Sequence, residues 1–121
     1  MDSSLSDCRV LVVEDDMMVL MIIEDMLANF GCTAVTTAAT VAQGLAAVDA
    51  RAFDVAMLDV NLNGEKSYPV ADALAAHGVP FCFATGYSDH AATGRHRDRP
   101  VLNKPFRYED LAKLLSRLAA R

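Results

Sequence analysis

The stretch RVLVVEDDMMVLMIIEDMLANFG, residues 9–31, contains the first two elements of the fold and their order. Arg9 to Val13 is an aliphatic and β-branched run typical of a buried strand. Met17 to Phe30 is long enough for a helix, and Gly31 follows as a stop signal. The apolar residues that recur at helical spacing in this segment are Leu20, Ile23, Leu27 and Phe30. A strand followed by a helix is the repeating unit of a parallel α/β sheet.

The same alternation continues along the chain. Four more strands are predicted, at residues 33–37, 55–59, 81–84 and 101–103. Three more helices are predicted, at residues 41–50, 69–77 and 108–120. This order favours a parallel sheet covered on both faces by helices in right-handed crossovers. One segment departs from it: GYSDHAATGRHRDR, residues 86–99, has no apolar period, so a loop or a single frayed turn replaces the expected crossover helix.

Composition indicates a folded single domain. The chain has 121 residues, of which 53% are hydrophobic and 22% charged, which is enough apolar surface for a core. We expect one domain over residues 1–121 and a monomer or weak dimer. The net charge of −5 argues against nucleic-acid binding. Cys8, Cys32 and Cys82 have no metal-ligand spacing and are expected to be buried thiols.

The chain also has no segment that predicts secretion or membrane insertion. The residues before Cys8 are polar and acidic, unlike a secretory signal. The most apolar run, Met17 to Met26, is interrupted by Glu24 and Asp25. We therefore expect a cytoplasmic protein.

Polar residues gather where the predicted strands end, and in a parallel sheet these ends share one rim. They are Glu14, Asp15 and Asp16 after the first strand, Asp59 and Asn61 at the third, Thr85 and Gly86 at the fourth, and Lys104 at the fifth. Clustered carboxylates repel one another unless a cation lies among them. Oxygen ligands without histidine or cysteine suit Mg²⁺. A metal, a lysine and an aspartate nucleophile together suit phosphoryl transfer.

Each of these residues also has a plain structural interpretation. Asp15 or Asp16 could cap the following helix, and for Asp16 we favour that role. Asp59 could be a turn residue ahead of Asn61 and Gly64, and Lys104 could be a solvated surface charge. The combination of all of them at one rim argues for a site.

Four motifs in the chain resemble the receiver domain of two-component response regulators: LVVEDD at 11–16, MLDVNL at 57–62, FATG at 83–86 and NKPF at 103–106. The resemblance covers about residues 9–118. It implies a flavodoxin-like, five-stranded parallel sheet of order 2-1-3-4-5. It also implies that the domain takes a phosphoryl group from a histidine kinase or histidine phosphotransfer protein, holds it as aspartyl phosphate with Mg²⁺, and changes shape to control a partner protein. Such a domain is a signalling phosphoacceptor rather than an enzyme.

The resemblance assigns the metal ligands and the phosphoacceptor. Asp59 would accept the phosphoryl group and also ligate Mg²⁺. Asp15 would be a direct ligand, Glu14 would act through water, and Asn61 would offer its main-chain carbonyl.

The resemblance also assigns the groups around the phosphoryl oxygens. Thr85 and Lys104 would each bond one of them, and Gly86 would keep the approach to Asp59 open. The peptide bond between Lys104 and Pro105 would be cis, as is typical of the family.

The switch departs from the usual receiver. Val101 stands where receivers usually carry an aromatic residue, so the usual aromatic toggle is absent. The run PFCFATGY, residues 80–87, resembles a subgroup named for its FAT GUY motif, which is linked to general stress signalling in alphaproteobacteria. This implies that Thr85, Gly86 and Tyr87 form the switch and that residues 88–99 are the part that moves.

Val19, Ile22 and Met26 form a second apolar stripe on the first helix, next to the core stripe. They either widen the core contact or form a docking surface for the helical bundle of a kinase.

Other functions remain as alternatives. A dehalogenase-type phosphatase carries its nucleophile on the first strand, whereas Asp59 ends the third. A flavodoxin-like flavin site would be repelled by the carboxylates after the first strand. The chain could also be a receiver that binds partners without phosphorylation, or the receiver module of a hybrid histidine kinase.

Overall fold

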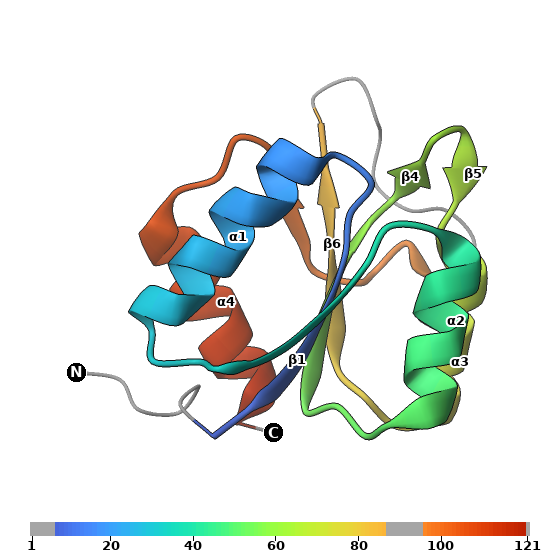
Figure 1. Ribbon diagram of the computed structural model, residues 1–121, viewed down its shortest axis with the longest axis horizontal. Helices are drawn as coiled ribbons and strands as arrows, with labels where there is room; N and C mark the ends of the chain where they lie inside the picture. Colours follow the sequence, from blue (N-terminus) through green and yellow to red (C-terminus); the bar gives the residue numbers. More distant parts are fainter. Residues whose placement is uncertain (1–6, 87–95, 121) are drawn as a thin grey trace.

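A computed structural model describes residues 7–86 and 96–120 of the protein. Its main sheet has five strands in the order β2-β1-β3-β6-β7, and every neighbouring pair is parallel (Figure 1). These strands are β1 (Arg9–Val13), β2 (Ala34–Ala38), β3 (Val55–Asp59), β6 (Phe81–Thr85) and β7 (Val101–Asn103). With β6 and β7 as the fourth and fifth strands of this sheet, the predicted flavodoxin-like order is confirmed.

Helices cover both faces of the sheet, as Figure 1 shows. The helices are α1 (Met17–Asn29), α2 (Val41–Ala50), α3 (Tyr68–Ala76) and α4 (Tyr108–Ala119). In β1, Val10 and Val12 pack in the core that contains the α1 and α4 stripes, while Leu11 and Val13 pack in the core under α2 and α3. Alternate residues of β1 thus serve opposite faces, because side chains alternate along a strand.

Local signals explain where α1 begins and ends. The Asp16 side chain accepts hydrogen bonds from the main-chain nitrogens of Met18 and Val19, at 3.0 and 3.3 Å. The capping role favoured for Asp16 is therefore confirmed. The helix ends at Asn29, one residue before the predicted Phe30, and Gly31 follows with a φ of 85°.

The structure adds one element that the sequence pattern did not predict. The segment after β3 forms an antiparallel hairpin of β4 (Asn61–Leu62) and β5 (Glu65–Lys66). Its turn residues Asn63 and Gly64 both have positive φ, 54° and 87°. This is the pattern of the Asn-Gly turn that two-residue hairpins favour. Strands of two residues are too short to show an apolar period.

The segment predicted to lack a crossover helix falls largely on residues 87–95, which lie outside the described residues, as does Tyr87. The described part that precedes β7 holds a turn, closed by a 3.1 Å hydrogen bond from the Arg99 nitrogen to the His96 carbonyl.

Cys8, Cys32 and Cys82 are buried free thiols, as predicted. Within residues 7–86 and 96–120, no helix has the length and apolar character needed to cross a membrane.

Candidate functional site

Strand pairing brings the polar residues to one end of the sheet. Asp59 and Thr85 are the last residues of β3 and β6, and Glu14 and Lys104 follow β1 and β7 directly. Main-chain hydrogen bonds hold the two flanking residues in register: the Glu14 nitrogen donates to Ala38 at 2.9 Å, and the Lys104 nitrogen donates to Thr85 at 2.8 Å. The side chains therefore start from a rigid frame of parallel strands.

Three carboxylates form the centre of the site. Oxygen atoms of Glu14, Asp15 and Asp59 lie within 4.8 Å of one another. The exposed fractions of Glu14 and Asp59 are 1% and 6%, and Asp15 is half-buried. Such closely spaced, desolvated negative charges are unfavourable without a cation.

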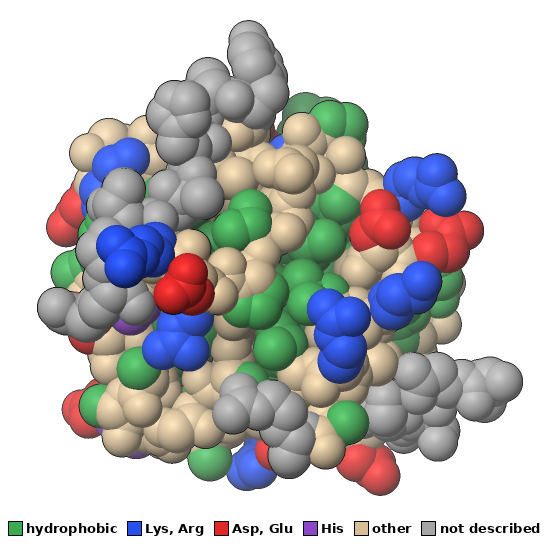
Figure 2. Space-filling model, turned by 180° about the vertical axis from the view of Figure 1, so that it is seen from behind, with side chains coloured by type: hydrophobic (Ala, Val, Ile, Leu, Met, Phe, Trp, Pro, Cys, Tyr) green, Lys and Arg blue, Asp and Glu red, His purple; other side chains and the backbone are tan. Residues whose placement is uncertain are grey.

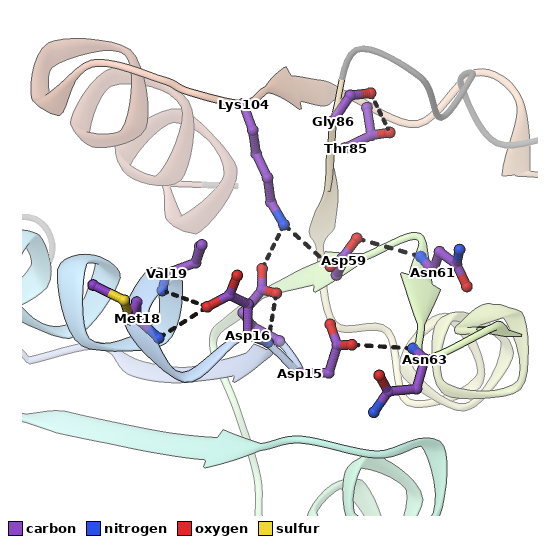
Figure 3. A network of polar contacts seen from close by, with 11 residues as sticks. Asp15, Asp16, Met18, Val19, Asp59, Asn61, Asn63, Thr85, Gly86 and Lys104 are labelled. Atoms are coloured by element: carbon purple, nitrogen blue, oxygen red, sulfur yellow. Dashed lines mark hydrogen bonds and ion pairs between the residues drawn. The ribbon is translucent and has the colours of Figure 1, made fainter.

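Lys104 supplies one positive charge between two of these carboxylates. Its Nζ lies 2.7 Å from Glu14 Oε1 and 3.1 Å from Asp59 Oδ2 (Figure 3). Burial raises the pKa of Glu14 to about 7 against the lowering effect of Lys104, and the charge of Asp59 adds to the rise. Burial alone would lower the pKa of Lys104, but its contacts with Glu14 and Asp59 outweigh this and raise it. Because the site has three carboxylates and one ammonium, a surplus of negative charge remains.

Main-chain donors orient the carboxylates further. The Asp16 nitrogen donates to Glu14 Oε2 at 3.0 Å, and the Asn61 nitrogen donates to Asp59 Oδ1 at 3.3 Å. Both oxygens of Glu14 and of Asp59 are therefore hydrogen-bonded. Figure 3 shows the Asn61 side chain turned away from the carboxylates, so its expected part in a metal site depends on its main-chain carbonyl.

The donor set fits a magnesium ion. The grouped atoms are carboxylate oxygens, which are the ligands that hard divalent cations prefer. A cation among them would relieve the repulsion that one lysine leaves. The cluster was predicted from strand ends alone, and the structure brings Glu14, Asp15, Asp59 and Lys104 together there.

Thr85 and Gly86 stand at the same rim, at the end of β6. The Thr85 hydroxyl donates to the Gly86 carbonyl at 3.1 Å. A Cβ added at Gly86 would meet no atom within 4 Å, so the described structure leaves open space there. The peptide bond between Lys104 and Pro105 is cis, as expected.

The comparisons with known proteins agree with this geometry. Residues 10–116 match the model of the family described as the response regulator receiver domain. The chain belongs to this family. It is thus a receiver domain of two-component systems. None of the curated proteins matches the chain.

Solved structures include a similar protein of nearly the same length. SdrG from Sphingomonas melonis Fr1 is 49% identical, with 97% of this chain and 98% of that chain covered and a TM-score of 0.83. The BeF3-activated conformation of SdrG from Pseudomonas melonis Fr1 is 48% identical, with 98% and 99% covered and a TM-score of 0.78. The receiver domain of the sensor histidine kinase PA1611 from Pseudomonas aeruginosa PAO1 has a magnesium ion in its active-site cleft. It is 24% identical, with 94% and 98% covered and a TM-score of 0.78, and shows the fold alone.

The predicted partner stripe of the receiver domain borders the site. Val19, Ile22 and Met26 line a groove of about 310 Å³ together with Lys104, Pro105 and Phe106. Val19 and Met26 also pack against the core, whereas Ile22 is 52% exposed. Val19 and Met26 therefore widen the core contact, while Ile22 stays exposed beside the groove. The sequence pattern did not predict that residues 104–106 line this groove, although the NKPF motif at residues 103–106 contains them.

Proposed function

We propose that this receiver domain accepts a phosphoryl group on Asp59 from a histidine kinase or histidine phosphotransfer protein and then switches conformation to control a downstream protein. The observation that carries the proposal is the position of Lys104 Nζ, 3.1 Å from Asp59 Oδ2, inside a cluster of three carboxylates. A nucleophilic carboxylate, a fixed ammonium and a set of cation ligands are the parts that phosphoryl transfer needs.

In the proposed reaction an Asp59 oxygen attacks the phosphorus of the donor. A P–O bond to Asp59 forms as the P–N bond to the donor imidazole breaks, and the imidazole leaves with the bond electrons and takes up a proton. Lys104 and Thr85 stabilise the charge on the phosphoryl oxygens. Asp15, Asp59, the Asn61 carbonyl and, through water, Glu14 would hold Mg²⁺. When bound, the ion supplies positive charge to the phosphoryl oxygens.

The domain turns over no external substrate in this scheme. Its chemistry is limited to its own phosphorylation and to the later hydrolysis of the aspartyl phosphate. Residues 1–121 act as one receiver unit, and the phosphorylated state is the signal.

Intact mass spectrometry after incubation with acetyl phosphate tests the proposal. We expect a Mg²⁺-dependent gain of one phosphoryl group that Asp59→Ala abolishes. Asp54→Ala is the matched control, because Asp54 lies at the other end of the sheet against Arg9. If no phosphodonor adds mass, the domain is instead a phosphorylation-independent binding module.

For the switch, we propose the FAT GUY type, with Thr85, Gly86 and Tyr87 as the moving parts and general stress signalling as the pathway. The run of residues 80–87 and the 49% identity with SdrG support this proposal. BeF3 is a natural second probe, since an activated conformation of SdrG with it has been solved. Spectra of the resting and of the activated protein are compared between the wild type and the variants Tyr87→Phe and Tyr87→Ala. If neither substitution changes these spectra, Tyr87 has no role in the switch.

For the docking surface, we propose that the kinase or phosphotransfer helices bind over Val19, Ile22 and Met26. The exposed Ile22 borders the groove that leads to Lys104, which supports the proposal. We expect Ile22→Asp and Met26→Asp to slow transfer from the cognate kinase but not from acetyl phosphate. Leu45→Asp on α2, at a residue that is 38% exposed, is the control and leaves both rates unchanged. Equal slowing with both phosphodonors would contradict the docking role.

A further inference from the structure

The β4–β5 hairpin lies directly beside the acidic cluster. Asn61 pairs with Lys66 and Leu62 pairs with Glu65, so the hairpin contains only two residue pairs. A two-stranded hairpin of this size has little stability of its own. Its shape therefore depends on the turn at Asn63 and Gly64, both of which adopt the left-handed conformation that the turn requires.

This turn contacts one of the three carboxylates. The Asn63 main-chain nitrogen donates to Asp15 Oδ2 at 3.1 Å, across 48 residues of sequence (Figure 3). The contact joins the loop after β1 to the segment after β3. Because a carboxylate has several acceptor positions, a hydrogen bond to Oδ2 leaves Asp15 able to ligate a cation.

Asp15 is the least constrained member of the cluster. Glu14 and Asp59 each have both oxygens hydrogen-bonded, and both side chains are buried. Asp15 is half-buried, and within the described ranges the bond from Asn63 is its only hydrogen bond or ion pair. Repulsion from the other two carboxylates pushes Asp15 outward. The Asn63 N–H opposes that movement.

We propose that the β4–β5 hairpin is a positioning element for the metal site: its turn holds Asp15 beside Glu14 and Asp59 and so sets the affinity for a divalent cation. This inference rests on the proposed function in placing Mg²⁺ among these carboxylates. Groups that orient a ligand by hydrogen bonds typically change metal affinity by about 10- to 100-fold when they are lost. We expect the lower end of this range, because Asp15 remains present and only its orientation is lost.

Two glycines make a matched test. Gly64 and Gly78 have φ of +87° and +71°, and a Cβ at either position meets no atom within 4 Å. Alanine at either position therefore adds backbone strain without a clash. Only Gly64 lies in the hairpin turn, whereas Gly78 follows α3.

The measurement is the dissociation constant of Mg²⁺, obtained by isothermal titration calorimetry without a phosphodonor, together with thermal unfolding. We expect Gly64→Ala and Gly78→Ala to lose similar stability, while only Gly64→Ala weakens Mg²⁺ binding, by about 10-fold. Gly64→Asn should restore the affinity, because asparagine tolerates the left-handed conformation. Equal Mg²⁺ affinity in the two alanine variants would overturn the inference.

A second readout follows the contact itself. Amide exchange of Asn63, measured by NMR, should accelerate in Asp15→Ala, since the amide loses its acceptor. Unchanged exchange would overturn the inference.

The outcomes also separate this inference from the proposed function. Phosphorylation of the wild-type protein with equal Mg²⁺ affinity in both variants rejects only the hairpin role. Weakened Mg²⁺ binding in Gly64→Ala without phosphorylation of the wild type rejects only the phosphoacceptor role.

Discussion

The two ends of the sheet each bring a basic side chain against a carboxylate. At the carboxyl end, Lys104 contacts Glu14 and Asp59 at 2.7 and 3.1 Å. At the amino end, Arg9 binds Asp54 through two side-chain hydrogen bonds, both of 3.1 Å. The contact distances alone do not distinguish the two ends.

Burial and charge balance do distinguish them. The exposed side-chain fractions of Lys104 and Glu14 are 20% and 2%, against 54% and 35% for Arg9 and Asp54. At the carboxyl end one ammonium contacts two members of a cluster of three carboxylates, whereas Arg9 and Asp54 pair one to one. Burial accordingly raises the pKa of Glu14, and Arg9 lowers the pKa of Asp54. A hollow of about 540 Å³ beside Arg9 lacks this surplus charge, so its size alone does not indicate a site.

The largest effect should come from removing the half-buried ammonium of Lys104. We expect Lys104→Met to slow phosphorylation by acetyl phosphate about 10²- to 10³-fold, the usual loss when one fixed donor to a charged transition state is removed. Arg9→Met removes the other basic side chain and should leave the rate unchanged. Time courses of intact mass measure both. Similar rates in Lys104→Met and the wild type would show that burial and surplus charge do not define the site.

The contact between His96 and Asp72, outside the carboxylate cluster, sharpens the comparison. His96 Nε2 lies 2.7 Å from Asp72 Oδ1, and the His96 side chain is 4% exposed. The rings of Tyr68, Phe81 and Phe83 stand about 6 Å away, at 5.9, 6.0 and 6.1 Å between centroids. We predict that this contact stabilises the folded protein.

We expect His96→Ala to lower the free energy of unfolding by about 2–3 kcal/mol, because it opens a cavity among the rings and removes the Asp72 contact. His77→Ala, at an exposed histidine, should change it by less than about 0.5 kcal/mol. Urea unfolding measures both. Equal losses would contradict a role for burial in the His96 contact.

The sequence predicted the frame of the site because simple rules determine it. The bounds of β1, β3, β7 and α2 match, since runs of aliphatic residues define these segments. Parallel strands then place Glu14, Asp59 and Lys104 at one edge whatever the details of packing. The predicted second and fourth strands end one residue before Ala38 and Thr85. These two strand ends are set by pairing with Val13 and Asn103 on the neighbouring strands.

The remaining features depend on contacts between distant segments. The link from Asn63 to Asp15 spans 48 residues, and that from His96 to Asp72 spans 24. No local period encodes such pairs. The Asn-Gly dipeptide at residues 63–64 did carry a signal for the hairpin turn. A pattern search based on apolar residues passes over it, because only Leu62 of the hairpin strands is buried.

The smallest effect should come from the exposed contact at the amino end. Hydrogen bonds from the Arg9 side chain and nitrogen lower the pKa of Asp54 in the folded protein. The stabilising contribution of Asp54 is therefore present above the pKa of the unfolded chain, about 3.9, and is lost as the pH falls through the lowered folded value. Asp54→Asn should accordingly be slightly less stable than the wild type near neutral pH, and the two proteins should converge in acid.

Chemical unfolding across the pH range measures this difference, with added salt as a second variable. Salt should shrink the difference near neutral pH, because exposed charges are screened. A difference that persists in high salt would mean that the amino-end pair behaves like a buried one. The contrast between the two ends would then rest on charge balance alone, because burial would no longer separate them.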